Sequence, residues 1–372
     1  MKIATIVGTR PELIKLSAVI KKLDTVCEHL LIHTGQNFDF ELNEIFFKDL
    51  EIRKPDVFLE AAGDNFAYTI SQIISKSYDV LVKEKPDAIL LYGDTNSCLS
   101  VIVAKKLKIP VFHMEAGNRC FDERVPEELN RKIVDHLSDI NMPISDHARK
   151  YMEREGISPE TIFKVGSSMP EVLNNQLNKI NSSNILSTLN LREKEFIVVS
   201  LHREENVDSL INLTKIVNSI NEIVKVYKKT IIFSIHPRTK NKLVSFGLED
   251  KLSNEVIQSK PFGFNDYIKL QQTSFCVISD SGTVSEESSI LKFPAITIRQ
   301  SHERPEAMDE GTVIMTGFVT KNIIDSIKIV TDSERGKTKT ALAYTSDNVS
   351  EKVVRIIFSY VDYINRNVWK KF

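Results

Sequence analysis

The sequence of 372 residues has no apolar run long enough to cross a bilayer, which argues against a membrane-spanning protein. Near its start, the short apolar run Lys2–Val7 is followed at once by Gly8, Arg10 and Glu12, so we interpret it as a buried strand and not as a secretion signal. The four cysteines lie far apart and form no C-x-x-C pair, which indicates free thiols in a reducing compartment. We therefore expect a cytoplasmic protein with no membrane partner.

An excess of charge of one sign is also missing. Lys and Arg together number 49 against 50 Asp and Glu, so the formal net charge is −1 at pH 7. This balance lacks the basic footprint of a nucleic-acid-binding protein, and we expect no nucleic-acid partner. Any anionic ligand must be bound by local donors, because the net field of the protein does not attract it.

Several cofactor motifs are absent as well. No G-x-G-x-x-G follows the first apolar run, and no Walker-type lysine loop is present. His202 and Glu205 have a spacing that could coordinate a metal ion, but no H-E-x-x-H and no further cluster accompanies them. We therefore expect neither a metal ion nor a nicotinamide cofactor.

Short apolar runs alternate with amphipathic helical segments along the whole chain, which predicts parallel sheets covered by helices on both faces. The chain is longer than one core usually serves, and the pattern restarts after Asn174–Lys194, a polar stretch with the composition of a linker. We therefore predict an α/β fold of two Rossmann-like, doubly wound domains joined near residue 180. The N-terminal domain would span 1–175 and the second domain 190–350, and a C-terminal helix at 351–372 would pack back toward the first domain.

The expected strands are short and apolar on both faces, as in a buried parallel sheet. In the first half they are Lys2–Val7, His29–His33, Ala88–Leu91, Val111–Met114, Ile140–Pro143 and Ile162–Val165. In the second half they are Phe196–Ser200, Thr230–Ile235, Val256–Gln258, Cys276–Ser279, Ala295–Ile298 and Val313–Met315. The helical period predicts helices at Pro11–Leu23, Asn96–Leu107, Pro126–Leu137, Leu210–Tyr227, Val284–Leu291 and Ser350–Lys370.

Glycine or titratable residues follow seven of these strands. In open α/β sheets the ligand lies beyond the carboxyl ends of the strands, so these segments are where a ligand is expected. They are Gly8–Glu12, His33–Gln36, Gly93–Asn96, His113–Gly117, Ser200–Glu205, His236–Arg238 and Asp280–Thr283. Such a concentration of polar strand ends predicts a ligand in a cleft between the two domains.

The segment Asp280–Thr283 opens a helix, and the exposed N–H groups of a helix N-terminus attract phosphate. Ser281 and Gly282 would allow close approach of the backbone, although an N-cap and turn explain the same residues. Glu287, one turn further on, could reach a ribose or serve as a favourable acid in the first turn. Arg10 could pair with a diphosphate, or could be an ordinary surface arginine.

Four carboxylates are candidates for proton transfer. Asp94, Glu115, Glu127 and Glu128 lie at or just past strand ends of the first domain. Carboxylates that are brought together and desolvated acquire separated pKa values, as a general acid and a general base require. Each also has a structural interpretation, as an N-cap or a first-turn acid, and position alone leaves both open.

Taken together, these segments resemble the non-hydrolysing UDP-N-acetylglucosamine 2-epimerases in order and spacing over nearly the whole chain. The matching pieces are GTRPE at Gly8–Glu12, HTGQ at His33–Gln36, GDT at Gly93–Thr95, HMEAG at His113–Gly117, PEELNR at Pro126–Arg131, HREEN at His202–Asn206, HPR at His236–Arg238, DSGTVSEE at Asp280–Glu287 and ERPE at Glu303–Glu306. The resemblance implies the glycosyltransferase-B fold with the active site in the interdomain cleft, a UDP-linked N-acetylamino sugar as substrate, no cofactor, and a homodimer.

The resemblance also implies the chemistry and the residues that carry it. Family enzymes break the anomeric C–O bond with loss of the carbon-2 proton, which leaves 2-acetamidoglucal and UDP, and then add UDP back with protonation on the other face. The family's catalytic acids and histidine match Asp94, Glu115, Glu127 and His202. Its diphosphate and ribose contacts match Arg10, Ser281, Gly282 and Glu287, and we count His236 of the HPR segment among the substrate-binding residues.

Departures from the family pattern narrow the substrate. The stretch Gly117–Asp122 and the tail Asn365–Lys370 are similar to the UDP-N-acetyl-L-fucosamine synthase branch, which epimerises UDP-2-acetamido-2,6-dideoxy-L-talose for capsule or O-antigen synthesis. The segment Gln36–Leu42 differs from the family segment that helps to bind an activating second UDP-N-acetylglucosamine, which argues against such activation. Alternative substrates are UDP-N-acetylglucosamine, giving UDP-N-acetylmannosamine, and a diacetamido uronate. Functions of another class would be a glycosyltransferase of the same fold or a UDP-sugar-binding protein.

Overall fold

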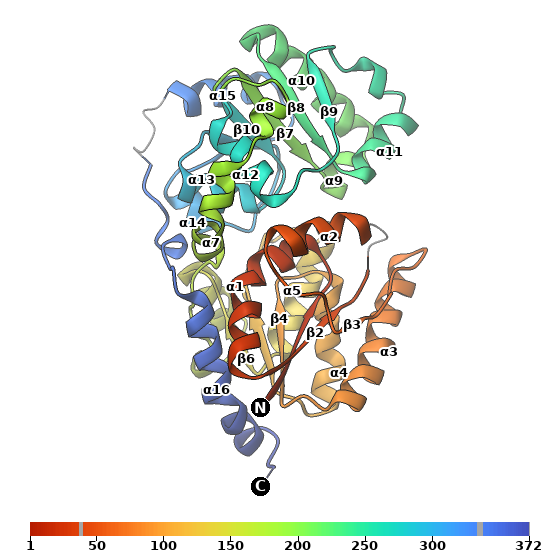
Figure 1. The fold of residues 1–372 in the computed structure, drawn as a ribbon, viewed down its shortest axis with the longest axis vertical. Helices are drawn as coiled ribbons and strands as arrows, with labels where there is room; N and C mark the ends of the chain where they lie inside the picture. Colours follow the sequence, from red (N-terminus) through yellow and green to blue (C-terminus); the bar gives the residue numbers. More distant parts are fainter. Residues whose placement is uncertain (37–39, 333–337, 372) are drawn as a thin grey trace. The chain divides into compact units, whose positions relative to one another are not determined.

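The computed structural model describes residues 1–36, 40–332 and 338–371, and it divides the chain into two compact units (Figure 1). The first unit comprises Met1–Asn175 together with Ala343–Phe372, and the second comprises Gln176–Leu342. Each unit is built around one six-stranded sheet with all strands parallel. In the described part of the chain, no helix has the length and apolar character needed to span a membrane.

The sheet of the first unit has the strand order β3-β2-β1-β4-β5-β6. Its strands are β1 (Lys2–Val7), β2 (Glu28–His33), β3 (Val57–Phe58), β4 (Ala88–Tyr92), β5 (Val111–Met114) and β6 (Ile140–Met142). The connecting helices are α1 (Arg10–Val26), α2 (Phe40–Asp49), α3 (Phe66–Glu84), α4 (Val101–Lys106), α5 (Pro126–Leu137) and α6 (Asp146–Arg154). The strand order changes direction between β1 and β4, which is where a doubly wound sheet places its ligand.

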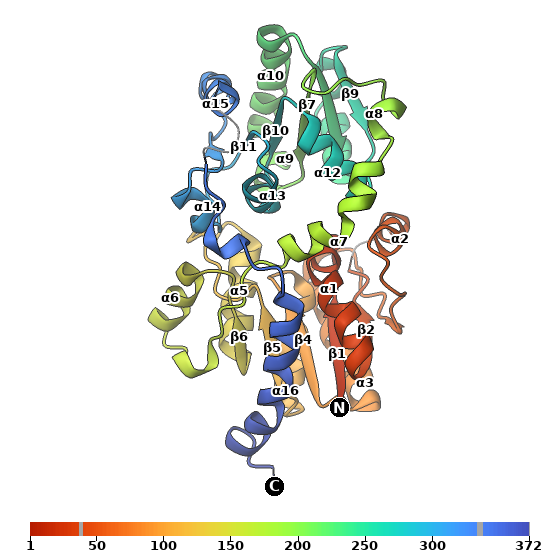
Figure 2. The same ribbon diagram turned by 60° about the vertical axis from the view of Figure 1, so that its left-hand side comes forward.

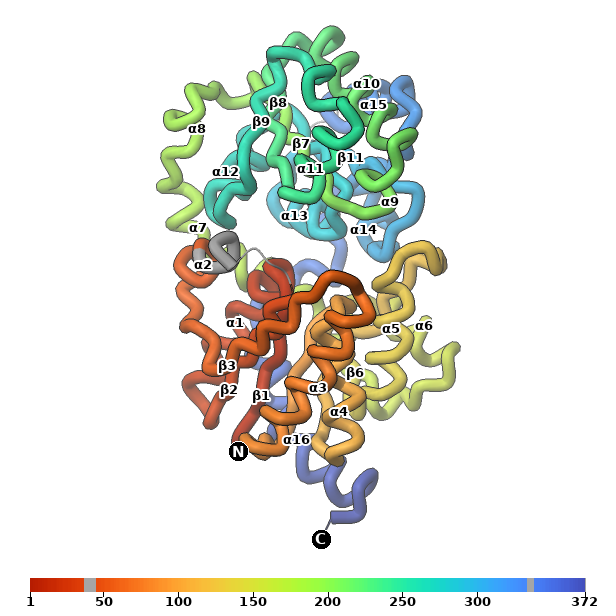
Figure 3. The backbone as a smooth tube through the Cα atoms, turned by 90° about the vertical axis from the view of Figure 1, so that its right-hand side faces the viewer, coloured from red at the N-terminus to blue at the C-terminus, as the bar shows by residue number. Residues whose placement is uncertain are grey.

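Helices cover both faces of this sheet. Leu91 of β4 packs in one apolar cluster with Val134 of α5, and α3, α4 and α5 lie side by side on that face (Figure 3). The opposite face carries α1, against which the C-terminal helix α16 (Val349–Asn367) packs (Figure 2). Lys22 of α1 and Glu351 of α16 form an ion pair of 2.7 Å. The last segment of the chain is therefore part of the first unit.

The sheet of the second unit repeats this plan, with the order β12-β11-β10-β7-β8-β9. Its strands are β7 (Phe196–Leu201), β8 (Thr230–Ile235), β9 (Val256–Ser259), β10 (Cys276–Ser279), β11 (Ala295–Thr297) and β12 (Ile314–Met315). The helices from the boundary onward are α7 (Met169–Ser182), α8 (Ile185–Thr188), α9 (Glu204–Val207), α10 (Leu210–Tyr227), α11 (Pro237–Ser245), α12 (Phe264–Thr273), α13 (Thr283–Leu291), α14 (Pro305–Asp309) and α15 (Thr320–Asp332). The change of direction here lies between β7 and β10.

The predicted doubly wound α/β architecture is confirmed, and most predicted strands match within two residues. Two predictions were wrong. Ile162–Val165 is not a strand, because it forms only an isolated bridge from Ile162 to Asn141 beside β6. The polar stretch Asn174–Lys194 is largely helical, since it contains most of α7 and all of α8. The predicted helix Asn96–Leu107 begins as a 3₁₀ turn before α4.

Candidate active site

Two of the predicted acids follow neighbouring strands of the first sheet. Asp94 comes two residues after the end of β4, Glu115 follows β5 directly, and Tyr92 is in register with Met114. The turn after β4 depends on Gly93, whose φ of +67° is in the left-handed region. A Cβ at this glycine would lie 4.0 Å from Glu115 Oε1, so the two acid-bearing loops lie close together.

Glu115 is held by a buried cation. Its Oε2 accepts hydrogen bonds from Lys15 Nζ at 2.7 Å and from the Tyr92 hydroxyl at 2.6 Å. Lys15 projects from α1 and is 2% exposed, and the Glu115 side chain is 9% exposed. Glu115 also has a left-handed φ of +60°, which costs free energy in a residue with a Cβ and is typical of functional sites. The ion pair fixes the carboxylate in spite of this strain.

Asp94 is held by a different cation. Its Oδ2 accepts from Arg131 Nε at 2.8 Å and lies 2.6 Å from Arg131 Nη2, and the third guanidinium nitrogen donates to Glu128 at 2.8 Å. Glu128 also accepts the backbone N–H groups of Cys120 and Phe121. Burial would raise the pKa of Glu128, but these N–H donors and Arg131 outweigh it and lower the pKa. Glu128 is therefore an ionised support for Arg131, whereas Asp94 does not cap the following helix.

The two anchors approach from opposite faces of the sheet. Successive side chains of a strand point to opposite faces, and Leu91 faces α5 whereas Tyr92 faces the side of α1. Lys15 of α1 therefore fixes Glu115 from one face, and Arg131 of α5 fixes Asp94 from the other. Two carboxylates are thus presented at adjacent strand ends by independent supports.

The remaining residues expected in this unit take different positions. Arg10 is the first residue of α1, and its guanidinium lies 5.6 Å from the centre of the Phe46 ring. Glu127 is in the first turn of α5 and is half-buried. Glu12 of the GTRPE segment accepts the N–H groups of Gly8 and Thr9 at 2.8 and 2.6 Å. Glu12 therefore stabilises the start of α1 as part of a capping box.

In the second unit, Asp280 organises the loop after β7. This fully buried carboxylate accepts the backbone N–H groups of His202 at 3.1 Å and Arg203 at 3.0 Å, and an amide N–H of Asn206 at 2.9 Å. It also lies 3.2 Å from Nδ1 of His202, whose side chain is 40% exposed. The ring of His202 is 6.4 Å from that of His236, which follows β8. Two of the predicted residues, His202 and His236, are therefore neighbours.

Ser281 and Gly282 form the turn that opens α13. The Ser281 hydroxyl oxygen accepts the Thr283 N–H at 3.3 Å, so Ser281 stabilises the turn, whereas the N-cap position itself is taken by Gly282. A Cβ at Gly282 would lie 2.4 Å from Glu303 Oε1, so any larger residue would require the Glu303 side chain to move. Glu287, one turn along the same helix, accepts a hydrogen bond of 2.7 Å from Gln271 and is 6% exposed. Nine residues of helix begin at this turn, with their N-terminal amides oriented to attract an anion.

Sequence reasoning missed the residues that hold the acids. Lys15 lies on the buried face of α1 between Leu13 and Leu16, and a lysine at such a position was the available signal. Arg131 was noted only as part of a matching segment, and its spacing of three from Glu128 suits an ion pair on one helix face.

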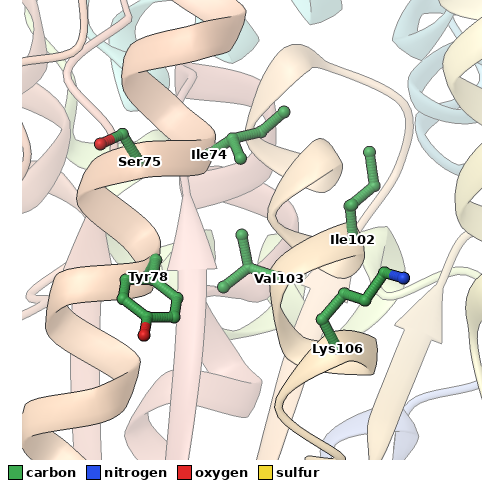
Figure 4. A pocket seen from close by; sticks show the side chains of 6 residues that line it. All are labelled: Ile74, Ser75, Tyr78, Ile102, Val103 and Lys106. Carbon is green, nitrogen blue, oxygen red and sulfur yellow. The ribbon is translucent and has the colours of Figure 1, made fainter.

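The segment Gln36–Leu42, which argued against activation by a second UDP-sugar, is only partly described. Residues 37–39 lie outside the described residues, as do the side chains of 40–42. Gln36 itself donates to the Thr95 hydroxyl at 3.2 Å, beside the turn that carries Asp94. A separate hollow of about 350 Å³ lies between α3 and α4 (Figure 4). It is lined by Ile74, Ser75, Tyr78, Ile102, Val103 and Lys106, and none of the expected site residues contributes to it.

Comparison with known proteins bears directly on this arrangement. A family model described as UDP-N-acetylglucosamine 2-epimerase matches residues 21–358. The structure of a UDP-N-acetylglucosamine 2-epimerase from Rickettsia bellii is 50% identical, covers 100% of both chains and has a TM-score of 0.92. That of Methanocaldococcus jannaschii UDP-GlcNAc 2-epimerase in complex with UDP-GlcNAc and UDP is 36% identical, covers 96% of this chain and 100% of its own, and has a TM-score of 0.92.

A relative with a different printed substrate is similar to nearly the same extent. The UDP-2,3-diacetamido-2,3-dideoxy-D-glucuronate 2-epimerase of Pseudomonas aeruginosa is 36% identical over 334 residues, which are 88% of this chain and 92% of the relative. The shared features are therefore those of UDP-sugar 2-epimerases in general, and they do not distinguish one sugar from another. The chain belongs to the family of non-hydrolysing UDP-N-acetylglucosamine 2-epimerases and is a UDP-sugar 2-epimerase, an isomerase with the glycosyltransferase-B-like fold.

Proposed function

We propose that the enzyme inverts carbon 2 of a UDP-N-acetylamino sugar by eliminating and re-adding UDP, with Asp94 and Glu115 as the main proton-transfer groups. The observation that carries the proposal is that these two carboxylates follow neighbouring strands and are fixed by separate cations from opposite faces of the sheet. Inversion requires one group to remove a proton from one sugar face and another to return it to the opposite face. Two independently supported acids suit that requirement.

The elimination balances without a redox partner. One carboxylate takes the proton from carbon 2, the C–H electron pair forms the C1=C2 double bond, and the anomeric C–O electrons leave with UDP. In the return step a diphosphate oxygen adds to carbon 1 and a proton is delivered to carbon 2 from the other face. We assign Glu127, in the first turn of α5, as a third acid of this reaction.

We propose that residues of the second unit bind UDP, and that Arg10 also contacts it. Ser281 and Gly282 at the start of α13 would bind the diphosphate, and Glu287 would bind the ribose, supported by the helix N-terminus and by the family resemblance. His202, whose loop is fixed by Asp280, would assist departure of the diphosphate. His236, whose ring neighbours that of His202, completes the substrate-binding set.

As substrate we propose UDP-2-acetamido-2,6-dideoxy-L-talose, converted to UDP-N-acetyl-L-fucosamine for capsule or O-antigen synthesis. The support is the stretch Gly117–Asp122, which places Cys120 and the 72% exposed Phe121 in the loop after Glu115. A loop that carries an apolar side chain suits a sugar with a methyl group in place of the 6-hydroxyl. The second candidate is UDP-N-acetylglucosamine, supported by the printed names of the Rickettsia and Methanocaldococcus relatives. The third is a diacetamido uronate, supported by the Pseudomonas relative.

Proton NMR in deuterated buffer tests both parts of this proposal. Purified protein is incubated separately with each of the three UDP-sugars and with no acceptor. We expect epimerised product with deuterium at carbon 2, fastest with the L-talose derivative. Since an apolar site rejects an extra hydroxyl only by roughly a hundredfold, slow turnover of UDP-N-acetylglucosamine is compatible with the proposal. Comparable turnover of UDP-N-acetylglucosamine would overturn the substrate, and product without label at carbon 2 would overturn the mechanism.

We also propose that the enzyme works as a homodimer, an expectation supported by the family resemblance. The chain has a mass of 42.3 kDa. Size-exclusion chromatography with light scattering should give twice this mass at micromolar concentration. A mass equal to one chain would contradict the dimer and leave the assigned chemistry untouched.

A further inference from the structure

A buried histidine links the two loops that carry Asp94 and Glu115. His113 of β5 is 1% exposed, and its Nε2 lies 2.7 Å from the carbonyl oxygen of Gly93. A carbonyl oxygen can only accept a hydrogen bond, so Nε2 is the donor. This carbonyl belongs to the peptide bond that leads into Asp94. His113 therefore fixes the backbone immediately before one of the two acids.

The other ring nitrogen of His113 contacts a carboxylate that fixes the second loop. Nδ1 lies 2.9 Å from Oδ1 of Asp135, a fully buried residue of α5. Asp135 also accepts the Gly117 N–H, at 3.0 Å to its nearer oxygen, and a hydrogen bond of 2.7 Å from Arg119 Nη1. Burial would raise the pKa of Asp135, but His113 and Arg119 outweigh it and lower the pKa. An ionised carboxylate thus holds the backbone two residues after Glu115.

Both turns have left-handed backbone conformations, and the one at Glu115 is strained. Gly93 and Gly117 have φ values of +67° and +79°, which glycine adopts at little cost because it has no Cβ. Glu115 has a φ of +60° and does have a Cβ, so this conformation persists only where its surroundings determine it. The side chains of His113 and Asp135 therefore contact the backbone of both turns, at the Gly93 carbonyl oxygen and at the Gly117 N–H, and contact each other.

We propose that His113 is a positioning residue of the epimerase, which sets the place of Asp94 through the Gly93 carbonyl while Asp135 sets that of the Glu115 loop. This inference rests on the proposed proton-transfer roles of the two acids. A buried histidine can also serve stability alone, so the test must separate the two. An acid displaced by about 1 Å can cost a hundredfold in rate without changing substrate binding.

Two substitutions of His113 test the hydrogen bonds of its two ring nitrogens separately. His113→Gln places an amide N–H near the position of Nε2 and can still donate to the Gly93 carbonyl. His113→Asn places its amide near the position of Nδ1, so it can reach Asp135 but not Gly93. We expect His113→Asn to lower kcat by roughly 30- to 100-fold with KM within about twofold, and His113→Gln to stay within about fivefold of the native kcat.

The chain offers a matched control in the same sheet. The side chain of His29 in β2 is also only 1% exposed, and it too contacts an aspartate, Asp24, at 2.6 Å and a second polar atom, Thr5 Oγ1, at 2.8 Å. It lies at the amino end of its strand, away from the loops that carry the acids. His29→Asn removes an equivalent buried contact, and we expect kcat to stay within about twofold of native.

The decisive measurement compares the deuterium at carbon 2 of the product with that at carbon 2 of the recovered substrate, early in a reaction in deuterated buffer. The native enzyme should place label in product and in recovered substrate in a fixed ratio, because each sugar face has its own acid. Displacing Asp94 slows exchange on one face, so His113→Asn should shift this ratio by at least threefold. Loss of folded protein would lower both labels equally and leave the ratio unchanged. Thermal unfolding of each variant is recorded alongside.

The outcomes are distinguishable. If native protein incorporates no label at carbon 2, the proposed function fails, whatever the variants do. If native protein incorporates label but His113→Asn keeps the native ratio, or if Asn and Gln variants lose activity equally, the positioning role is wrong. Where His113→Asn does not fold, Asp135→Asn replaces it, since it removes the charge that orients the ring. Because Asp135 also holds the Glu115 loop, this variant should displace both acids, and a kcat within about twofold of native would overturn the inference.

Discussion

At the scale of single residues, the acids depend on buried cations that are themselves expensive to bury. Lys15 and Glu115 have side chains only 2% and 9% exposed, and they form an ion pair of 2.7 Å. Removing one partner leaves an uncompensated charge in a low dielectric, which typically costs about 3–5 kcal/mol. Removing both charges costs much less, because neither is then left unpaired.

We therefore predict that Lys15→Met destabilises the protein by about 3–5 kcal/mol and abolishes turnover. Adding Glu115→Gln to Lys15→Met should restore most of the stability, because the unpaired carboxylate is gone, but no activity. Urea unfolding and an epimerase assay of the single and double variants check this. A double variant as unstable as Lys15→Met would show that the pair is not coupled as its geometry indicates.

Single substitutions should also distinguish residues that bind UDP from residues that transfer protons. Arg10→Ala and Ser281→Ala should each weaken UDP binding by roughly 1–3 kcal/mol, since each removes a hydrogen bond to a charged group. Asp94→Asn and Glu115→Gln should leave UDP affinity near normal and remove turnover. Calorimetric titration with UDP, together with the NMR assay, distinguishes the two groups. The reverse pattern would mean that the roles are exchanged.

The sequence predicted which residues lie at the strand ends but not what holds them. Asp94 and Glu115 were predicted at strand ends of the first domain, and the structure shows that their strands, β4 and β5, are neighbours in the sheet. The partners Lys15 and Arg131 come from helices on opposite faces, and such contacts depend on side-chain packing that no local pattern specifies. Glu128 is a first-turn acid of α5, as one of the two interpretations predicted, and its contact with Arg131 is a further role that its position alone did not reveal.

At the scale of elements, the end of β2 carries a group that makes stability depend on pH. His33 is 1% exposed and stacks on Phe58 with ring centres 5.0 Å apart, and its Nδ1 accepts the Gly35 N–H at 3.0 Å. Burial lowers the pKa of His33 from 6.5 to about 4. As pH falls, the unfolded chain therefore binds a proton at this position before the folded chain does.

We predict that the stability owed to neutral His33 is fully present above pH 6.5 and is lost as pH falls toward 4. The loss should reach about 2 kcal/mol at pH 5. His33→Asn keeps an acceptor for the Gly35 N–H and has no titrating group, so its stability should fall less over this range. Urea unfolding of both proteins at pH 7, 6 and 5 measures the difference. If the free energy of unfolding fell equally with pH in the two proteins, His33 would not be the group responsible.

Elements that are apolar on both faces were the most predictable. The strands β1, β5, β8 and β10 agree with their predicted bounds, because a buried parallel strand is a continuous apolar run. The two-residue strand β3 was missed, since its residues are half-buried or exposed at the edge of the sheet. The polar stretch after residue 174 was predicted to be a linker, but its first part belongs to the amphipathic helix α7. In that helix Ile180 is buried although its sequence neighbours are polar.

At the scale of the whole molecule, the chain leaves the first unit near residue 175 and returns to it at residue 343. The returning segment ends in α16, which packs on α1 and has fully buried apolar side chains at Val353 and Ile357. Stability of the first unit should therefore depend on residues that are nearly the last in the sequence. The helical period predicted this helix, whereas its contact with α1 depends on packing that no local pattern specifies.

We predict that Ile357→Ala destabilises the first unit by about 2–5 kcal/mol, the usual cost of a large-to-small change in a core. The neighbouring Phe358 is 40% exposed, so Phe358→Ala should cost within about 1 kcal/mol and serves as the matched control. Hydrogen exchange of peptides from each unit gives the separate measurement. Exchange should rise in β1, α1 and α16 and stay native in β7, β8 and α10, because the substituted side chain is part of the first core only. Equal acceleration in both units would show that they unfold as one cooperative body, and the division into two compact units would then describe contacts but not stability.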